Sequence, residues 1–247
     1  TVTPTNTAPN VVPTGTTYTW TVAAGAGITG ASNQATAQTS ISQTLTNTTS
    51  TSLSAIYTVT ASVGTAPNIC TDTFDITVTV NPKPSIADVT QAICTGNTFT
   101  VTPTNTAPDV VPTGTTYTWT VAAPAGITGA SNQATAQTSI SQTLTNATSN
   151  SIVVTYTVTA SFGTGPTVCT DTFIITVTVN PNPSIANKTQ TICSGTTFTV
   201  TPSNTAPDVV PTGTTYTWSV AAPAGITGAS NQATAQTSIS QTLTNTT

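Results

Sequence analysis

The chain has almost no charge. Only 3% of its 247 residues are charged, whereas about 25% is usual in globular proteins. It contains no histidine and no methionine, and arginine and glutamate are also absent. The ionic side chains are those of two lysines and six aspartates: Lys83, Lys188, Asp72, Asp75, Asp88, Asp109, Asp171 and Asp208. Nucleic-acid binding is therefore excluded, because nothing here can neutralise a phosphate backbone.

These absences also exclude several kinds of site. Without histidine the chain has neither a Ser-His-Asp triad nor an imidazole ligand for a metal. Two lysines without arginine do not make a phosphate clamp. No set of acid, base and nucleophile is present, so we expect neither enzymatic activity nor a cofactor. No apolar run approaches the ~18 residues that indicate a membrane-spanning helix.

Threonine dominates what is present. It accounts for 69 of the 247 residues, 36% of the chain is hydrophobic, and the net charge is only −4. Disordered chains usually combine low hydrophobicity with a high net charge, and this chain has neither feature. Threonine and valine are β-branched and favour strands. The composition therefore predicts an ordered all-β protein whose surfaces are covered by hydroxyl groups.

The sequence consists of near-copies of one unit that is 99 residues long. Residues 1–49 match residues 100–148 at 46 of 49 positions, and residues 100–148 match residues 199–247 equally well. Residues 50–99 match residues 149–198 at 34 of 50 positions. The chain holds two and a half copies and starts and stops within a copy, so we expect it to be a segment of a longer array.

The length of the repeat favours a β-sandwich. One coil of a solenoid takes about 20–45 residues, whereas one immunoglobulin-like sandwich takes about 100. The strings NPKP (81–84) and NPNP (180–183) predict stiff, exposed boundaries, because closely spaced prolines do not fit in a central strand. They define a first unit, 1–81, that lacks its first strand, a complete second unit, 82–180, and a third unit, 181–247, that lacks its last strands.

Alternating residues predict the strands of the second unit. In Thr116–Val121, Tyr117, Trp119 and Val121 share one face and threonines share the other, which is typical of a half-buried strand. We place Trp119 in the core, with Trp20 and Trp218 at the same position of the other units. Further strands are expected at 86–93, 98–103, 139–145, 152–161 and 173–179, with Gly/Pro-rich connections at 105–114 and 122–134. The predicted fold class is all-β, as tandem immunoglobulin-like β-sandwich repeats.

Four strings resemble a known family: ICSGTTFTVTP (192–202), TTYTWSV (214–220), YTVTAS (156–161) and CTDTFIITVTVNPNP (169–183). They resemble the PKD-like, immunoglobulin-like repeats of giant surface adhesins that Bacteroidota export by type IX secretion, including gliding-motility adhesins. The resemblance covers the whole chain and implies an extracellular or cell-surface protein without catalytic residues. The acidic turn WDFGDG of standard PKD domains is absent, and Trp119-Thr-Val-Ala-Ala stands in its place.

The four cysteines occupy two positions of the repeat, since Cys70 corresponds to Cys169 and Cys94 to Cys193. Without a CxxC motif or histidine they form no metal site, and one pair per exported unit indicates disulfides. Our first choice joins Cys94 to Cys169 within the second unit and leaves Cys70 and Cys193 to units outside the chain.

Two alternative pairings are open. Pairs Cys70–Cys94 and Cys169–Cys193 require a sharp fold-back of the linker, because bonded cysteines have Cα atoms within about 7 Å. If the first and last strands of a unit run end to end, Cys94 and Cys169 lie at opposite ends of the sandwich. Each cysteine is then bonded to an adjacent unit.

The threonine rows and the acidic pairs each have a functional and a structural interpretation. Rows of threonines at alternate positions, as in TYTWTV, could bind ice or glycans. Large apolar residues alternate with these threonines, so the rows are interpreted as the outward faces of strands. Asp72 and Asp75 could hold calcium, but no pair of carboxylates recurs in every copy. Thr73 and Thr172 are candidate acceptors of O-glycans among the many surface hydroxyls.

The lysines do not support a repeated crosslink. Lys83 aligns with Asn182, and Lys188 aligns with Val89, so an isopeptide bond between lysine and asparagine does not recur in these copies.

Together these observations predict a non-catalytic structural repeat region of a secreted or cell-surface filament or adhesin. The expected partners are neighbouring copies of the protein in a filament or bundle, because low net charge weakens self-repulsion. One alternative is a passive stalk that presents a distal ligand-binding domain. Another is a carbohydrate-binding accessory module of a secreted enzyme, which an exposed aromatic platform would favour.

Overall fold

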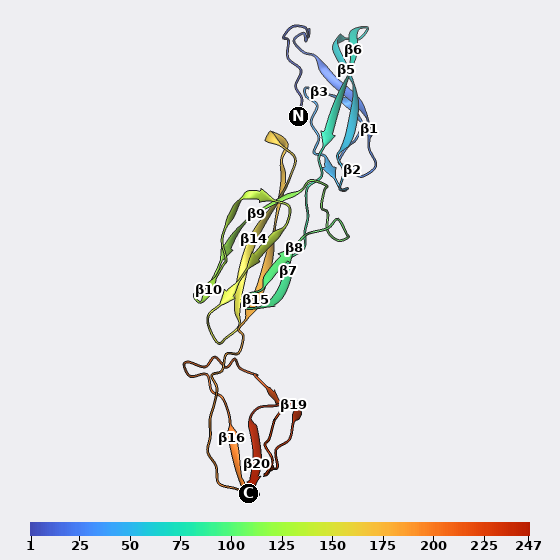
Figure 1. The fold of residues 1–247 in the computed structure, drawn as a ribbon. Helices are drawn as coiled ribbons and strands as arrows, with labels where there is room; N and C mark the ends of the chain where they lie inside the picture. Colours follow the sequence, from blue (N-terminus) through green and yellow to red (C-terminus); the bar gives the residue numbers. More distant parts are fainter.

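The computed structural model describes residues 1–247 as an elongated rod in which three β-rich units follow one another (Figure 1). The prediction of an all-β fold is confirmed: the one helical element is a short 3₁₀ turn, η1 (Gly165–Thr167). The structure holds no helix with the length and apolarity that a membrane crossing requires.

The second unit contains two layers of strands. Its larger sheet has the order β11–β9–β14–β15–β7. In the smaller layer β8 pairs with β12, and β13 pairs with β10. The bounds are β7 (Val89–Cys94), β8 (Thr98–Val101), β9 (Thr116–Ala122), β10 (Ile127–Thr128), β11 (Gln133–Gln137), β12 (Ile140–Thr143), β13 (Thr145–Asn146), β14 (Ile152–Phe162) and β15 (Cys169–Asn180).

The first strand of this unit lies beside the last strand and runs in the same direction. β7 pairs in parallel with β15, with Val89 opposite Ile175 and Cys94 opposite Asn180. The other pairings of the larger sheet are antiparallel. β7 therefore covers the edge of β15 from the middle of that strand to its end.

Alternation along the central strands creates the core. The inward residues of β9, β14 and β15 are apolar, while the threonines between them point away from the core. Phe99 of β8 meets Tyr156 of β14 across the interior, with ring centroids 5.0 Å apart. The core comprises 15 buried residues: Ile86, Phe99, Val101, Tyr117, Trp119, Ile140, Leu144, Val154, Tyr156, Val158, Ala160, Phe173, Ile175, Val177 and Val179.

The first unit repeats this arrangement without a strand against its last one. Its larger sheet has the order β3–β1–β5–β6, so one edge of β6 is unpaired. Its core cluster has 6 buried residues, which shows how much the first strand and its flanks add in the second unit. The bounds are β1 (Thr17–Ala24), β2 (Ile28–Thr29), β3 (Gln34–Gln38), β4 (Thr46–Asn47), β5 (Leu53–Thr65) and β6 (Asn68–Val80).

The third unit contains the smaller layer and part of the larger sheet. One sheet has the order β16–β20–β18, and β17 pairs with β19. The bounds are β16 (Thr196–Val200), β17 (Tyr216–Trp218), β18 (Ile226–Thr227), β19 (Gln232–Gln236) and β20 (Ile239–Asn245).

Two expectations about chain segments need correction. In the first linker, NPKP, the side chains of Pro82 and Pro84 are fully buried, although Lys83 between them is exposed. In the second linker, NPNP, Pro183 is exposed as expected. The segment 122–134 is not a plain connection either. It contains β10 and the start of β11, which pairs with β9 through Gln133 and Gln137 with a shift in register between them.

Candidate functional site

The tryptophan position of each unit belongs to a polar network at the edge of the core. The side chains of Trp20 and Trp119 are each 6% exposed, and that of Trp218 is partly exposed. Trp119 Nε1 donates to the Ser131 carbonyl at 3.1 Å. Gln142 Nε2 donates to the same carbonyl at 2.7 Å, and Tyr156 donates its hydroxyl proton to Gln142 Oε1 at 2.8 Å. The indole thus pins the segment before β11 onto the sheet and offers no aromatic platform.

The two candidate calcium ligands lie on an outer strand face. Asp72 and Asp75 are exposed on β6, and Asp75 accepts a hydrogen bond from Thr58 Oγ1 at 2.9 Å. Nowhere in residues 1–247 do three cysteine or carboxylate side chains gather in a group suited to a metal ion.

Another aspartate position anchors the segment that leads into the first strand. Asp208 accepts hydrogen bonds from Lys188 Nζ and from the Ala186 amide, the latter at 2.9 Å. The bond from Lys188 lowers the pKa of the Asp208 carboxyl, and the bond from Ala186 lowers it further. In the second unit Asp109 accepts the corresponding backbone bond at 2.9 Å, although Val89 replaces the lysine. The hydrogen bond from the backbone amide to the aspartate occurs in both the second and the third unit, whereas an ion pair between this aspartate and a lysine occurs only in the third.

One contact recurs at both junctions between units. At the first junction Asn105 Nδ2 donates to Ser50 Oγ at 2.9 Å. At the second, Asn204 Nδ2 donates to Ser149 Oγ at 2.6 Å. The Oδ1 atom of Asn105 also accepts a bond from the Val111 amide of its own loop at 3.0 Å. Each asparagine therefore shapes its own loop and docks that loop on the preceding unit.

A buried asparagine holds the turn that carries each junction serine. Asn146 Nδ2 donates to the carbonyls of Asn150 and Val179 at 2.7 and 2.9 Å, and its Oδ1 accepts a bond from the Thr148 amide at 2.9 Å. Asn47 makes the corresponding bonds in the first unit. Each asparagine begins an Asn-x-Thr sequence, the acceptor pattern for N-glycans. Its side-chain amide is buried and hydrogen-bonded, so this side chain stabilises the turn.

The linker between the first and second units is held by further contacts. Lys83 Nζ forms an ion pair with Asp171 Oδ1 at 3.0 Å. Asn81 Nδ2 donates to the Thr167 carbonyl at 3.4 Å, which joins the end of β6 to the β14–β15 hairpin. In Figure 1 this hairpin reaches from the second unit toward the first. With Pro82 and Pro84 buried between them, these contacts oppose bending at the first junction.

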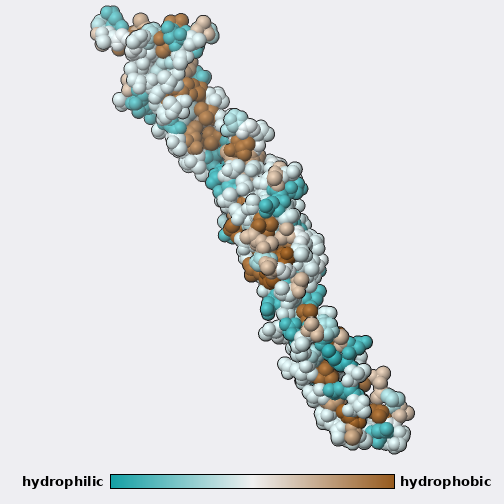
Figure 2. Space-filling model, turned by 90° about the vertical axis from the view of Figure 1, so that its left-hand side faces the viewer, coloured by the Kyte–Doolittle hydropathy of each residue, from teal (hydrophilic) through white to brown (hydrophobic).

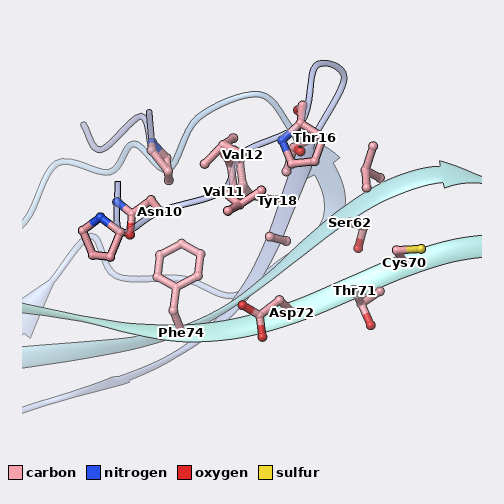
Figure 3. A pocket seen from close by; sticks show the side chains of 15 residues that line it. Asn10, Val11, Val12, Thr16, Tyr18, Ser62, Cys70, Thr71, Asp72 and Phe74 are labelled. Carbon is pink, nitrogen blue, oxygen red and sulfur yellow. Dashed lines mark hydrogen bonds between the residues drawn. The ribbon is translucent and has the colours of Figure 1, made fainter. Parts of the chain in front are cut away.

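The first unit has a groove of about 530 Å³ along β6 and the loop around Val11 (Figure 3). Val11 is 83% exposed, and Tyr18, Phe74 and Cys70 line the same groove. In the second unit the corresponding place is covered, because Ser85 pairs with Val110 and Ile86 enters the core. The groove is therefore the seat that the segment before the first strand occupies in a complete unit.

The predicted Cys94–Cys169 bond must be corrected. Cys169 begins β15, whereas Cys94 pairs with Asn180 at the other end of that strand. At about 3.3 Å per residue these points are roughly 36 Å apart, and a disulfide requires Cα atoms within about 7 Å. All four cysteines, Cys70, Cys94, Cys169 and Cys193, are unpaired in the structure. The parallel pairing of β7 with β15 places the two residues at opposite ends of the sandwich, which is the arrangement of the alternative with bonds to adjacent units.

The surface is mostly weakly polar, with scattered apolar patches (Figure 2). Threonines fill the outward positions of the long strands, and Thr73 and Thr172 are both exposed. The exposed large apolar side chains come from separate segments, including Ile69 and Val153. The outer faces therefore present hydroxyl and methyl groups with very few charges.

Comparison with known proteins identifies the repeats. No curated protein gave a match. The chain of a solved structure of zebrafish RET cadherin-like domains 1 to 4 aligns with 92% of this chain and 58% of its own length, at 11% identity and a TM-score of 0.19. This chain thus spans less than two thirds of that structure, and so low a TM-score carries no argument. The family described as PKD-like domain matches residues 3–84, 91–183 and 190–247. The chain therefore belongs to the PKD-like domain family, as three successive repeats.

Proposed function

We propose that the chain is the structural repeat region of a secreted or cell-surface filament or adhesin and acts mechanically. The observation that carries this proposal is the recurrence of the asparagine–serine contact at both junctions. A contact that repeats with the sequence period sets the same relation between successive units. An array of such units extends as a rod, which is the property that a stalk or a filament body needs.

The proposal places the protein outside the cell, on the surface of a bacterium of the Bacteroidota that uses type IX secretion. PKD-like domains are typically extracellular, non-catalytic modules, which supports the location and the role. The sequence resemblance to giant surface adhesins of the Bacteroidota supports the proposed organism and export route.

The filament and the stalk are two forms of this role. Low charge and hydroxyl-covered faces support lateral contacts between copies, which favours a filament or bundle. A passive stalk with a distal ligand-binding domain uses the same rod without lateral contacts. The carbohydrate-binding alternative has less support, since Trp20 and Trp119 lie in the core.

The junction contact can be tested without disturbing the cores. Ser50→Ala and Ser149→Ala together remove the oxygens that accept the inter-unit bonds and leave both asparagines in place. Small-angle scattering and electron microscopy should show a wider spread of bending angles and a shorter mean length than in the parent rod. β15 has 12 residues and is about 40 Å long, so a rod of three units of this length should measure roughly 120 Å.

The matched control is Ser141→Ala, which removes a hydroxyl bonded within the second unit. It should leave the bending distribution unchanged. Equal flexibility of the parent and the double variant would contradict the mechanical proposal.

A further inference from the structure

We propose that consecutive units are joined by a disulfide. The bond links the cysteine that ends the first strand of one unit, the position of Cys94, to the cysteine that begins the last strand of the next unit, the position of Cys169. This inference rests on the array in the proposed function, but its test measures bond formation and not bending, so the two can fail separately.

The repeat places the first partner. In the second unit Cys94 pairs with Asn180, and the Thr95 amide donates to the Asn180 carbonyl at 2.8 Å. Asn81 holds the corresponding place in the first unit, 99 residues earlier. A first strand added to the free edge of β6 therefore ends with its cysteine beside Asn81, at the strand spacing of about 4.8 Å.

The second cysteine, Cys169, already lies near Asn81. Cys169 Sγ lies 3.8 Å from the Thr167 carbonyl oxygen. Asn81 Nδ2 lies 3.4 Å from the same oxygen. Asn81, which directly follows β6 of the first unit, and Cys169 of the second unit thus both lie next to the carbonyl oxygen of Thr167.

The space between them is open in the first unit. A hollow of about 660 Å³ lies at this junction, lined by Leu45, Val80 and Asn81 on one side and by Thr167 and Cys169 on the other. In the second unit the residues after Cys94 occupy the corresponding place, because the Gly96 amide donates to the Leu144 carbonyl at 2.8 Å. The hollow is where the end of a first strand and its cysteine fit.

The side chains also point the right way. Along β7, Ile93 packs against the core and Cys94 is exposed on the opposite face. Cys94 shares this face with its partner Asn180, because paired residues of neighbouring strands point to the same side. Asn81 uses the same face to reach Thr167, so the added cysteine is directed toward Cys169.

This arrangement explains why no two cysteines of the chain meet. Cys70 lies near the outer end of the first unit, next to the β5–β6 turn. Cys94 pairs with Asn180 directly before the linker to the third unit, and Cys193 holds the corresponding position of the third unit. Each cysteine serves a different junction, and every junction takes one cysteine from each side.

The chemistry is thiol–disulfide exchange with an external disulfide. One thiolate attacks the donor and forms a mixed disulfide, releasing one donor thiol. The second cysteine then attacks the bonded protein sulfur and releases the other donor thiol. Two protein thiols are oxidised and one donor disulfide is reduced to two thiols. Oxidised glutathione is a suitable donor, and exported proteins meet such oxidising conditions.

The test uses the full chain with a second copy of residues 82–99 placed before Thr1, which restores the first strand of the first unit. After reduction and treatment with oxidised glutathione, the added cysteine should bond to Cys169. Thiol alkylation and intact mass should then show three labelled cysteines out of five. Chymotryptic peptides should show the added cysteine linked to Cys169.

Two matched variants of the extended chain decide the assignment. Cys70→Ser should still form the bond, whereas Cys169→Ser should leave all remaining cysteines free to react. Five labelled cysteines in the folded extended chain would overturn the proposal. A bond from the added cysteine to Cys70, or bonds only between separate chains, would also overturn it.

Discussion

Trp119 combines burial with a hydrogen bond, and both are lost when its side chain is truncated. Trp119→Ala should lower the free energy of unfolding of the second unit by about 3–5 kcal/mol, the usual cost of removing a buried aromatic ring. Urea denaturation followed by circular dichroism measures this change. The matched variant Trp218→Ala should cost less, because that ring is partly exposed. Equal midpoints for the parent and Trp119→Ala would contradict the assignment to the core.

Tyr156 makes stability sensitive to alkaline pH. Burial raises its pKa from an ordinary value of 10.0 to about 12. The folded pKa lies above the unfolded one. The protonated tyrosine therefore makes its full contribution to stability below pH 10, and this contribution is lost as the pH rises toward 12. Burial also raises the pKa of Tyr57 and of Tyr117, and the negative charge of Asp109 adds to the effect on Tyr117.

The variant Tyr156→Phe isolates this effect. At neutral pH the free energy of unfolding of the variant should be about 1 kcal/mol lower than that of the parent, because the hydrogen bond to Gln142 is lost. Between pH 10 and 12 only the parent is destabilised by ionisation of this tyrosine. The difference in free energy of unfolding between the two proteins should therefore narrow or reverse. Urea denaturation of both proteins across this range measures it. A difference that stays constant with pH would count against a buried, protonated Tyr156.

The Asp208–Lys188 pair predicts a pH effect of the opposite sense. Its lowered pKa means that the carboxylate stabilises the third unit above the ordinary carboxyl range and loses this effect as the pH falls through the folded value. Lys188→Val copies the residue of the second unit. Titration of the carboxyl by NMR should show the pKa of Asp208 rising in this variant. An unchanged pKa would mean that the lysine contributes nothing.

At the scale of elements, alternation predicted the strands that carry large apolar residues. β9 and β14 begin at or beside the expected residues, because Tyr117, Trp119, Val154 and Tyr156 need one buried face. β11 was missed because its sequence, QATAQ, has no large apolar residue and is held by its pairing with β9. β15 begins four residues before the predicted Phe173, in a polar hairpin that reaches the preceding unit.

Two glycines with similar backbone angles provide a matched test of the turns. Gly129 has φ +88, and a Cβ there would lie 2.1 Å from the Thr143 carbonyl oxygen. Gly114 has φ +93, with nothing within 4 Å of the added atom. Gly114→Ala should cost about 1 kcal/mol from backbone strain alone. Gly129→Ala should cost about 2–4 kcal/mol, because a clash adds to the strain.

Thermal unfolding of the two glycine variants measures the difference. Equal melting temperatures would show that the approach of Gly129 to the β12 backbone is not required.

At the scale of the whole molecule, the period was visible in the sequence but the junctions were not. Asn105 and Ser50 are 55 residues apart in the chain, and neither stands out among the many asparagines and serines. The prolines of NPKP predicted an exposed spacer, but proline is also apolar enough to be buried where two units meet. The cysteines indicated disulfides, but their partners depend on the direction of the first strand, which composition does not encode.

Assembly between rods is the last expectation, and the surface determines its character. The two ion pairs of the chain, Lys83–Asp171 and Lys188–Asp208, already engage both lysines. Lateral contacts must therefore use threonine, serine and asparagine faces or the loop 105–114, and weak contacts that recur with every unit add up by multivalency. Near-identical units present the same surface repeatedly, and the edges of their sheets carry almost no lysine to oppose pairing.

Sedimentation and electron microscopy of the full chain should consequently show ordered bundles at high concentration. Raising the salt concentration roughly tenfold should leave them nearly unchanged, since screening acts on charges that these faces lack. Dissolution by salt would instead place the few aspartates in the contacts. Isolated rods at every concentration would remove the filament and leave the stalk, because the same junctions stiffen a single array whether or not its faces meet another.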